Sequence, residues 1–125
     1  MICHPRAFFA RAIPVARLIV GIVLALGLSV QASAGEFTAR IQSILVYEDG
    51  DLVYVYPEGG VKTPPACHGS NGDYTSFKLN RPRAREYFAA LLGAQLAGKT
   101  VLFRTIGACV DQSVSDTLSY FKVNS

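Results

Sequence analysis

The spacing of hydrophobic residues switches from a strand pattern to a helical pattern and then back again, and this single helical interval constrains the fold more than any other feature. Apolar residues before Asn80 and after Lys99 alternate or form short β-branched runs, which is typical of strands. Between them, apolar residues recur at helical spacing. Asn80 can cap a helix start, and Gly98 can adopt the left-handed conformation that ends many helices. The sequence predicts one helix, Arg81–Ala97, placed late in an otherwise β-rich chain.

The predicted strands begin with a hairpin. Thr38–Tyr47 is rich in β-branched residues, and a turn containing Asp49-Gly50 separates it from Leu52–Tyr56, which is a strong hairpin signal. The second run is apolar on both faces, so we expect it to lie centrally in the sheet or to be covered on both sides. Val61–Cys67 contains adjacent prolines that cannot donate to a ladder, so it is an edge strand or a loop. The remaining predicted strands are Tyr74–Leu79, Lys99–Ile106 and Asp116–Asn124.

This order predicts a mostly β fold with one α-helix. The expected architecture is a small antiparallel barrel of about five strands, of the oligonucleotide/oligosaccharide-binding (OB) type. A ferredoxin-like sandwich requires two helices, and the sequence predicts one. An OB barrel normally places its helix between strands three and four. The order here fits if Val61–Cys67 and Tyr74–Leu79 are two parts of one broken third strand.

The first 34 residues have the pattern of a secretory signal peptide. Residues 1–17 carry three arginines and no acid, Leu18–Val30 is an uncharged apolar run, and Ala32 and Ala34 occupy the −3 and −1 positions of a cleavage site. The alternative is an uncleaved anchor, but a spanning helix needs about 20 apolar residues. We expect cleavage after Ala34, a single domain at 35–125, a periplasmic or secreted location, and no membrane partner after cleavage.

Net charge argues against one class of partner. The whole chain has a formal charge of +3, but the surplus arginines, Arg6, Arg11 and Arg17, all lie in the leader. From Gly35 onward, nine basic and nine acidic residues balance. A protein that binds nucleic acid through phosphate charge needs a basic surface, so we expect no nucleic-acid partner.

Export also shapes the interpretation of the cysteines. Cleavage removes Cys3 and leaves Cys67 and Cys109, and an even count in an exported domain is typical of a disulfide. The alternatives are metal ligands or a catalytic thiol, with His68 as the remaining histidine. Zinc is disfavoured because Cys67 and His68 are adjacent and the sequence has no Cys-x-x-Cys spacing. We expect a Cys67–Cys109 disulfide, no metal and no cofactor.

Several segments together resemble a known group of proteins. The stretch from Pro65 to Phe77, the predicted helix, and the segment from Gly98 to Cys109 are similar to the OB-fold B subunits of AB-type bacterial toxins, such as subtilase cytotoxin and typhoid-type toxins. The resemblance implies exported chains with an OB fold, assembled in rings of five with helices lining the centre, and in many cases a sialylated glycan ligand. Glycan-binding members carry Ser-Pro-Tyr early in strand two, where this chain has Leu52-Val53-Tyr54, so no glycan site is carried over from the group.

The two sides of the predicted helix differ in character. We expect Ala84, Phe88, Leu91, Leu92 and Gln95 to lie on the core side. The opposite side is small and nearly uncharged, with Glu86 as its charged residue. One interpretation is an exposed alanine-rich face, favoured by helix propensity. The other, which the resemblance favours, is an oligomer interface formed by Ala89, Ala90, Gly93 and Ala97.

Arg81, Arg83 and Arg85 form the first candidate ligand-binding group. They crowd the helix start, where the helix dipole disfavours cations. Together with free backbone N–H groups, three guanidinium groups can capture an anion such as a carboxylate, sulfate or phosphate. The alternative is a solvated cluster that pairs with Glu86 or with a more distant acid.

Tyr54 and Tyr56 form the second candidate ligand-binding group. They share one face of their strand, and Tyr47 and Tyr74 are further tyrosines of the same hairpin region. Tyrosines on a barrel face can stack against sugar rings or bases. The alternative is that these side chains are half-buried and pack the sheet.

The sequence offers no catalytic arrangement. A nucleophile needs a base and an orienting group, and His68 adjoins the expected disulfide. We therefore expect an exported, non-enzymatic binding module that recognises a glycan or a protein partner, with a homo-oligomer as the assembly that the resemblance implies. The alternative is a monomeric periplasmic interaction or inhibitor protein.

Overall fold

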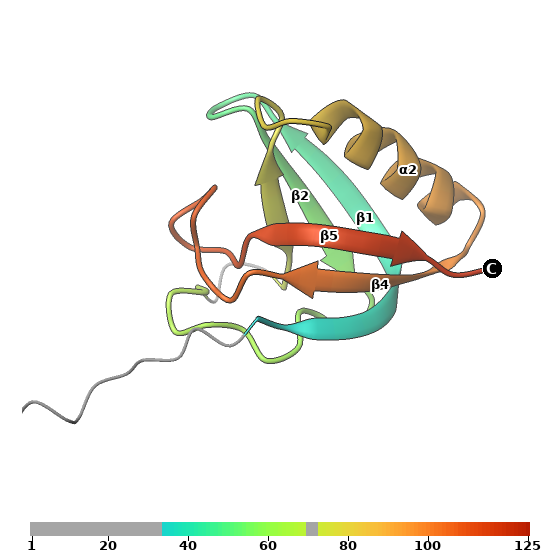
Figure 1. Ribbon diagram of the computed structural model, residues 1–125, viewed down its shortest axis with the longest axis horizontal. Helices are drawn as coiled ribbons and strands as arrows, with labels where there is room; N and C mark the ends of the chain where they lie inside the picture. The colour runs from blue at the N-terminus through green and yellow to red at the C-terminus, as the bar shows by residue number, and fades with distance from the viewer. Residues whose placement is uncertain (1–33, 70–72) are drawn as a thin grey trace, which may run out of the picture. The chain divides into compact units, whose positions relative to one another are not determined.

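The computed structural model describes residues 34–69 and 73–125 (Figure 1). The predicted signal peptide therefore lies outside the described residues, apart from Ala34 at its end. The described elements are β1 (Glu36–Tyr47), β2 (Leu52–Pro57), β3 (Thr75–Lys78), α2 (Ala84–Leu96), β4 (Thr100–Thr105) and β5 (Leu118–Val123).

The described chain is mostly β with one helix, which confirms the predicted fold class. Its five strands form one sheet in the order β3-β2-β1-β4-β5, and every neighbouring pair is antiparallel. The long strand β1 pairs with β4 through its first half and with β2 through its second half. Its register shifts between Ile41 and Ser43, where the strand passes from one neighbour to the other.

The sheet is open rather than closed into a barrel. Its two edge strands, β3 and β5, do not share a ladder, and one isolated parallel bridge joins Ser76 of β3 to Thr117, just before β5. Val61–Cys67 forms no strand in the structure, so the loop alternative is confirmed and the expected broken third strand is wrong. Pro64 and Pro65 give the physical reason, because neither has a backbone N–H to donate to a ladder.

The core lies between the sheet and α2. Val53 and Val55 of β2 are fully buried, as are Phe77 of β3, Phe103 of β4 and Leu91 of α2. The alternation along β2 follows the sequence pattern, and β2 is central as predicted. In Figure 1, α2 runs alongside β1 at one end of the sheet.

The helix begins three residues later than predicted. Pro82 and Arg83 are the central residues of a turn in which the Ala84 N–H donates to the Arg81 carbonyl over 3.2 Å, and Arg83 has a φ of 64°. Proline fixes the first central φ and a positive φ follows, as in a type II turn. This turn delays the helix start to Ala84. The predicted cap at Asn80 is therefore wrong, and the N-cap residue, Arg83, makes no side-chain cap hydrogen bond.

The helix ends as the sequence predicts. Gly98 has a φ of 62°, and its N–H donates to the Gln95 carbonyl over 3.1 Å. The Lys99 N–H donates to the Ala94 carbonyl over 2.9 Å. These two bonds form a Schellman motif, which requires a left-handed residue at the glycine position.

The buried side of α2 is rotated slightly from the predicted one. Ala84 and Leu91 are buried as expected, but Ala94 is buried in place of Leu92, which is 36% exposed. Gln95 instead anchors the helix to β1, because its Nε2 donates to the Gln42 carbonyl over 3.2 Å. Within residues 34–69 and 73–125, no helix has the length and apolar character that a membrane span requires.

Candidate binding face

Tyr54 and Tyr56 lie together on the face of β2 that points away from the core. The residues between and beside them, Val53 and Val55, point into the core. Across the sheet, Tyr54 is paired with Leu45 of β1 on one side and with β3 on the other. The predicted alternation along this strand is therefore present, and it brings both tyrosines to one outer face.

A stacked group of four rings occupies this face, and we refer to Tyr47, Tyr54, Tyr56 and Tyr74 as the tyrosine cluster. The ring centroids of Tyr47 and Tyr54 are 5.7 Å apart, and those of Tyr54 and Tyr74 are 4.4 Å apart. Tyr56 is tilted against Tyr74, with ring centroids 5.1 Å apart. Exposure grades across the cluster, from 5% at Tyr74 to 44% at Tyr47. The cluster therefore has a buried anchor and an accessible outer end.

The side-chain amide of Gln112 is hydrogen-bonded to two hydroxyls of the tyrosine cluster. This residue lies in the loop between β4 and β5, and its Nε2 donates to the Tyr54 hydroxyl oxygen over 2.8 Å. Its Oε1 accepts hydrogen bonds from the Tyr74 hydroxyl at 3.0 Å and from Ser115 Oγ at 2.7 Å. Sequence reasoning missed Gln112, because a single glutamine in a polar loop carries no signal and Tyr54 is 58 positions away.

Burial affects the titration of two hydroxyls in the cluster. Burial is the main cause that raises the pKa of Tyr54, and the neighbouring Tyr74 raises it further. The pKa of Tyr56 is raised by burial and then by Tyr74. Because a phenol titrates near pH 10 without such effects, both hydroxyls keep their protons at neutral pH.

The β4–β5 loop that carries Gln112 is fixed at several points. The predicted disulfide is present, with Cys67 and Cys109 Cα atoms 6.1 Å apart, and it ties this loop to the segment before β3. The Gly69 N–H donates to the Val114 carbonyl over 2.8 Å, which joins the same two segments as the disulfide. The carbonyl of Asp116 accepts the Thr75 hydroxyl at 2.8 Å. The disulfide and these hydrogen bonds therefore hold the backbone of the β4–β5 loop, and with it Gln112, in place.

His68 also helps to hold the β4–β5 loop in place. The Asp116 backbone N–H donates to His68 Nδ1 over 3.1 Å. Asp116 is fully buried, and its Oδ1 accepts the Gly107 N–H at 3.0 Å. Among the described residues, His68 Nε2 and Asp116 Oδ2 are buried without a hydrogen-bond partner. In this arrangement the histidine orients a loop backbone.

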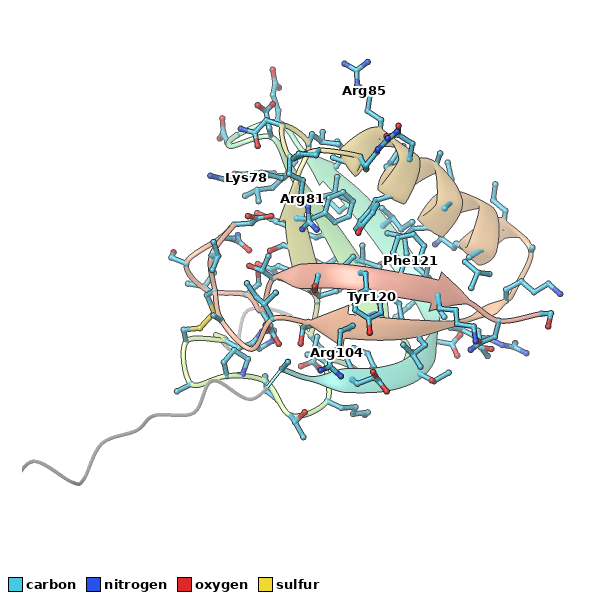
Figure 2. The ribbon with its side chains drawn as sticks, viewed as in Figure 1. Lys78, Arg81, Arg85, Arg104, Tyr120 and Phe121 are labelled. Atoms are coloured by element: carbon cyan, nitrogen blue, oxygen red, sulfur yellow. A yellow bond between two sulfur atoms is a disulfide. The ribbon has the colours of Figure 1, made fainter. Side chains whose placement is uncertain are left out.

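The three arginines of the first candidate group lie in different environments (Figure 2). Arg81 points inward and donates to the carbonyls of Leu118 and Ser119 of β5. Arg83 pairs with Glu86 at 3.4 Å on the surface, and Arg85 extends away from the helix. The structure therefore does not bring the three guanidinium groups to one point.

Arg81 instead links the two edges of the open sheet. Its guanidinium lies 3.6 Å from the Asp111 carboxylate, and the same carboxylate oxygen accepts the Lys78 N–H of β3 at 2.9 Å. Arg81 thus connects β5 carbonyls to an acid that caps β3, and we call this arrangement the Arg81–Asp111 clasp. The guanidinium also lies over the Tyr87 ring, 5.1 Å from its centroid. The sequence left open that an arginine of this group pairs with a distant acid, and Asp111 is the acid that pairs with Arg81.

The side of α2 opposite the core is exposed, as the sequence predicts. All four residues of the predicted oligomer interface are exposed: Ala89, Ala90, Gly93 and Ala97. A Cβ built at Gly93 meets nothing within 4 Å. This face is open in the single chain, and its use as an interface stays a prediction.

Among residues 34–69 and 73–125, no group of three or more His, Cys, Asp or Glu side chains is arranged to hold a metal ion. The comparisons with known proteins give no family. No protein-family profile, no curated protein and no solved structure matches this chain.

Proposed function

We propose that this protein is an exported, non-enzymatic binding module whose tyrosine cluster contacts a glycan. One observation supports this most: four tyrosine rings, one from β1, two from β2 and one from just before β3, form one contiguous group on the outer sheet face, with Tyr47 at its accessible end. Such a group offers ring surface and hydroxyls side by side. A sugar presents the matching features, since its C–H faces stack on aromatic rings and its hydroxyls hydrogen-bond.

Further support comes from the surroundings of the cluster. The loop facing it is held by a disulfide, which is typical of proteins in oxidising compartments such as the periplasm or the exterior. Leu45, beside Tyr54, is 41% exposed and extends the apolar part of the surface. Contacts on a face of this kind are individually weak, so a ring of subunits, as the toxin B-subunit resemblance implies, would strengthen binding through avidity.

Binding to immobilised oligosaccharides tests this proposal. A panel of neutral and acidic mono- to tetrasaccharides is probed with the wild-type protein and with Tyr47→Ala. Loss of the Tyr47 ring is expected to weaken binding about tenfold, equivalent to about 1.4 kcal/mol. The matched control is Tyr120→Ala, because Tyr120 is 48% exposed on β5, outside the cluster (Figure 2).

Two outcomes would contradict the proposal. Equal losses in both variants would show that the cluster has no special role. If the wild type binds no sugar but captures an envelope protein through Tyr47, the alternative of a periplasmic interaction or inhibitor protein replaces the glycan.

A further inference from the structure

The amide of Gln112 lies with its oxygen toward Tyr74 and Ser115 and its nitrogen toward Tyr54. Its Oε1 accepts from the Tyr74 hydroxyl and from Ser115 Oγ, at 3.0 and 2.7 Å. A carbonyl-type oxygen has two lone pairs, so both are used. The amide nitrogen has donors only, and it points at the Tyr54 hydroxyl oxygen, 2.8 Å away.

The proton of the Tyr54 hydroxyl is consequently directed elsewhere. Its oxygen already accepts from Gln112, and none of the hydrogen bonds among residues 34–69 and 73–125 uses the Tyr54 proton. The raised pKa of Tyr54, caused first by burial and then by Tyr74, keeps this proton in place at neutral pH. The cluster therefore offers an oriented O–H donor next to stacked rings.

We infer that Gln112 is a specificity-determining residue of this face, because it orients the Tyr54 hydroxyl as a donor and thereby selects glycans that place a hydrogen-bond acceptor there. This inference rests on the proposed function. An acetal oxygen, a ring hydroxyl or the carbonyl of an N-acetyl group meets the requirement. A deoxy sugar that lacks the acceptor at that position leaves the donor unpaired and binds more weakly.

Gln112→Glu provides the sharpest perturbation. The two side chains have nearly the same shape, but a carboxylate has acceptors only. The Tyr54 hydroxyl then donates its hydrogen bond to the carboxylate introduced at position 112, and its oxygen is free to accept from outside. We expect Gln112→Glu and Tyr54→Phe to weaken binding of the best sugar on the panel by about tenfold each.

A double-mutant cycle separates this role from general damage. If Gln112 acts through the Tyr54 hydroxyl, Gln112→Glu causes no further loss in a Tyr54→Phe background. Additive losses would overturn the inference. Gln112→Met, which keeps the length but removes the amide, is the second variant if the glutamate destabilises the loop, and it too should lose its effect in the Tyr54→Phe background.

A spectroscopic measurement tests the inference without any ligand. The paired ring bands of tyrosine in the Raman spectrum report whether a phenol donates or accepts a hydrogen bond, and the difference between wild type and Tyr54→Phe isolates Tyr54. Gln112→Glu is expected to move this difference signal toward a stronger donor. An unchanged signal would refute the role of Gln112, whereas a changed signal with no sugar bound by the wild type would refute the glycan proposal and leave the hydroxyl orientation standing.

Discussion

Removing the Arg81 side chain should destabilise the open sheet severely. Arg81 donates to the Leu118 and Ser119 carbonyls of β5, lies over the Tyr87 ring and faces the Asp111 carboxylate. Because the Arg81 side chain is 24% exposed, we assign its two hydrogen bonds about 1 kcal/mol each, below the range of roughly 1.5–3 kcal/mol for charged groups, and the cation–π contact adds about 0.5–1 kcal/mol. We do not add a full ion-pair energy, because the Arg81 and Asp111 side chains remain 24% and 17% exposed.

The expected loss for Arg81→Ala is therefore about 3 kcal/mol in the free energy of unfolding, the sum of the two hydrogen bonds and the cation–π contact. For a domain of this size, that loss lowers the melting temperature by roughly 15 °C. Arg81→Lys keeps the charge but not the fork that reaches both carbonyls, so it should fall between wild type and Arg81→Ala.

Urea and thermal unfolding of the exported protein measure this effect. Arg85→Ala is the charge-matched control, because Arg85 extends into solvent and should change stability by less than about 0.5 kcal/mol. If Arg81→Ala and Arg85→Ala unfold alike, the clasp does not hold the β3 and β5 edges together, and the reasoning is refuted.

Four further predictions concern other parts of the chain. Replacing Cys67 and Cys109 with serine should cost about 4 kcal/mol, since the bridge spans 42 positions, and a denaturation curve that matches wild type would contradict this. Gly98→Ala should cost about 1 kcal/mol from its φ of 62° alone, because a Cβ there meets nothing within 4 Å; a neutral melt would contradict the strain argument. Because the pKa of Tyr54 is raised in the folded state, the unfolded state loses the Tyr54 proton at a lower pH than the folded state does. Stability should therefore be constant in this respect below about pH 10 and fall above it, and Tyr54→Phe should flatten that fall in urea titrations. Gly93→Glu should convert any oligomer seen by native mass spectrometry into monomer without loss of helix content, and an unchanged assembly would remove α2 from the interface.

The sequence predicts well those parts of the fold that local chemistry decides. Asp49-Gly50 predicts the turn between β1 and β2, where Gly50 has a φ of 85°. Gly98 predicts the helix end, because a left-handed residue is needed for its hydrogen bonds. The helix start is different: Pro82 forms a turn whose second central residue is an arginine with positive φ, a conformation that residue type rarely adopts.

Long-range partners lie beyond such local reasoning. Arg81, Arg83 and Arg85 look equivalent in the sequence, yet only contacts with β5 and Asp111, thirty or more positions away, separate Arg81 from the other two. Gln112 is hidden for the same reason, since its contacts with Tyr54 and Tyr74 join positions 58 and 38 apart. A single sequence shows which residues alternate and which can turn, but not which loop folds back onto which strand.

The β4–β5 loop connects the stability of this fold with its candidate function. Asp111 in this loop completes the clasp between the sheet edges, and Gln112, the next residue, orients the tyrosine cluster. A sheet closed by a full ladder would have no need of these side chains at its edge. Because adjacent residues serve both purposes, loosening the clasp should also disorder the cluster. Arg81→Ala is therefore expected to weaken sugar binding even at temperatures where the protein remains folded, whereas Arg85→Ala is not. Binding that survives in folded Arg81→Ala would show that the cluster holds its arrangement independently of the clasp.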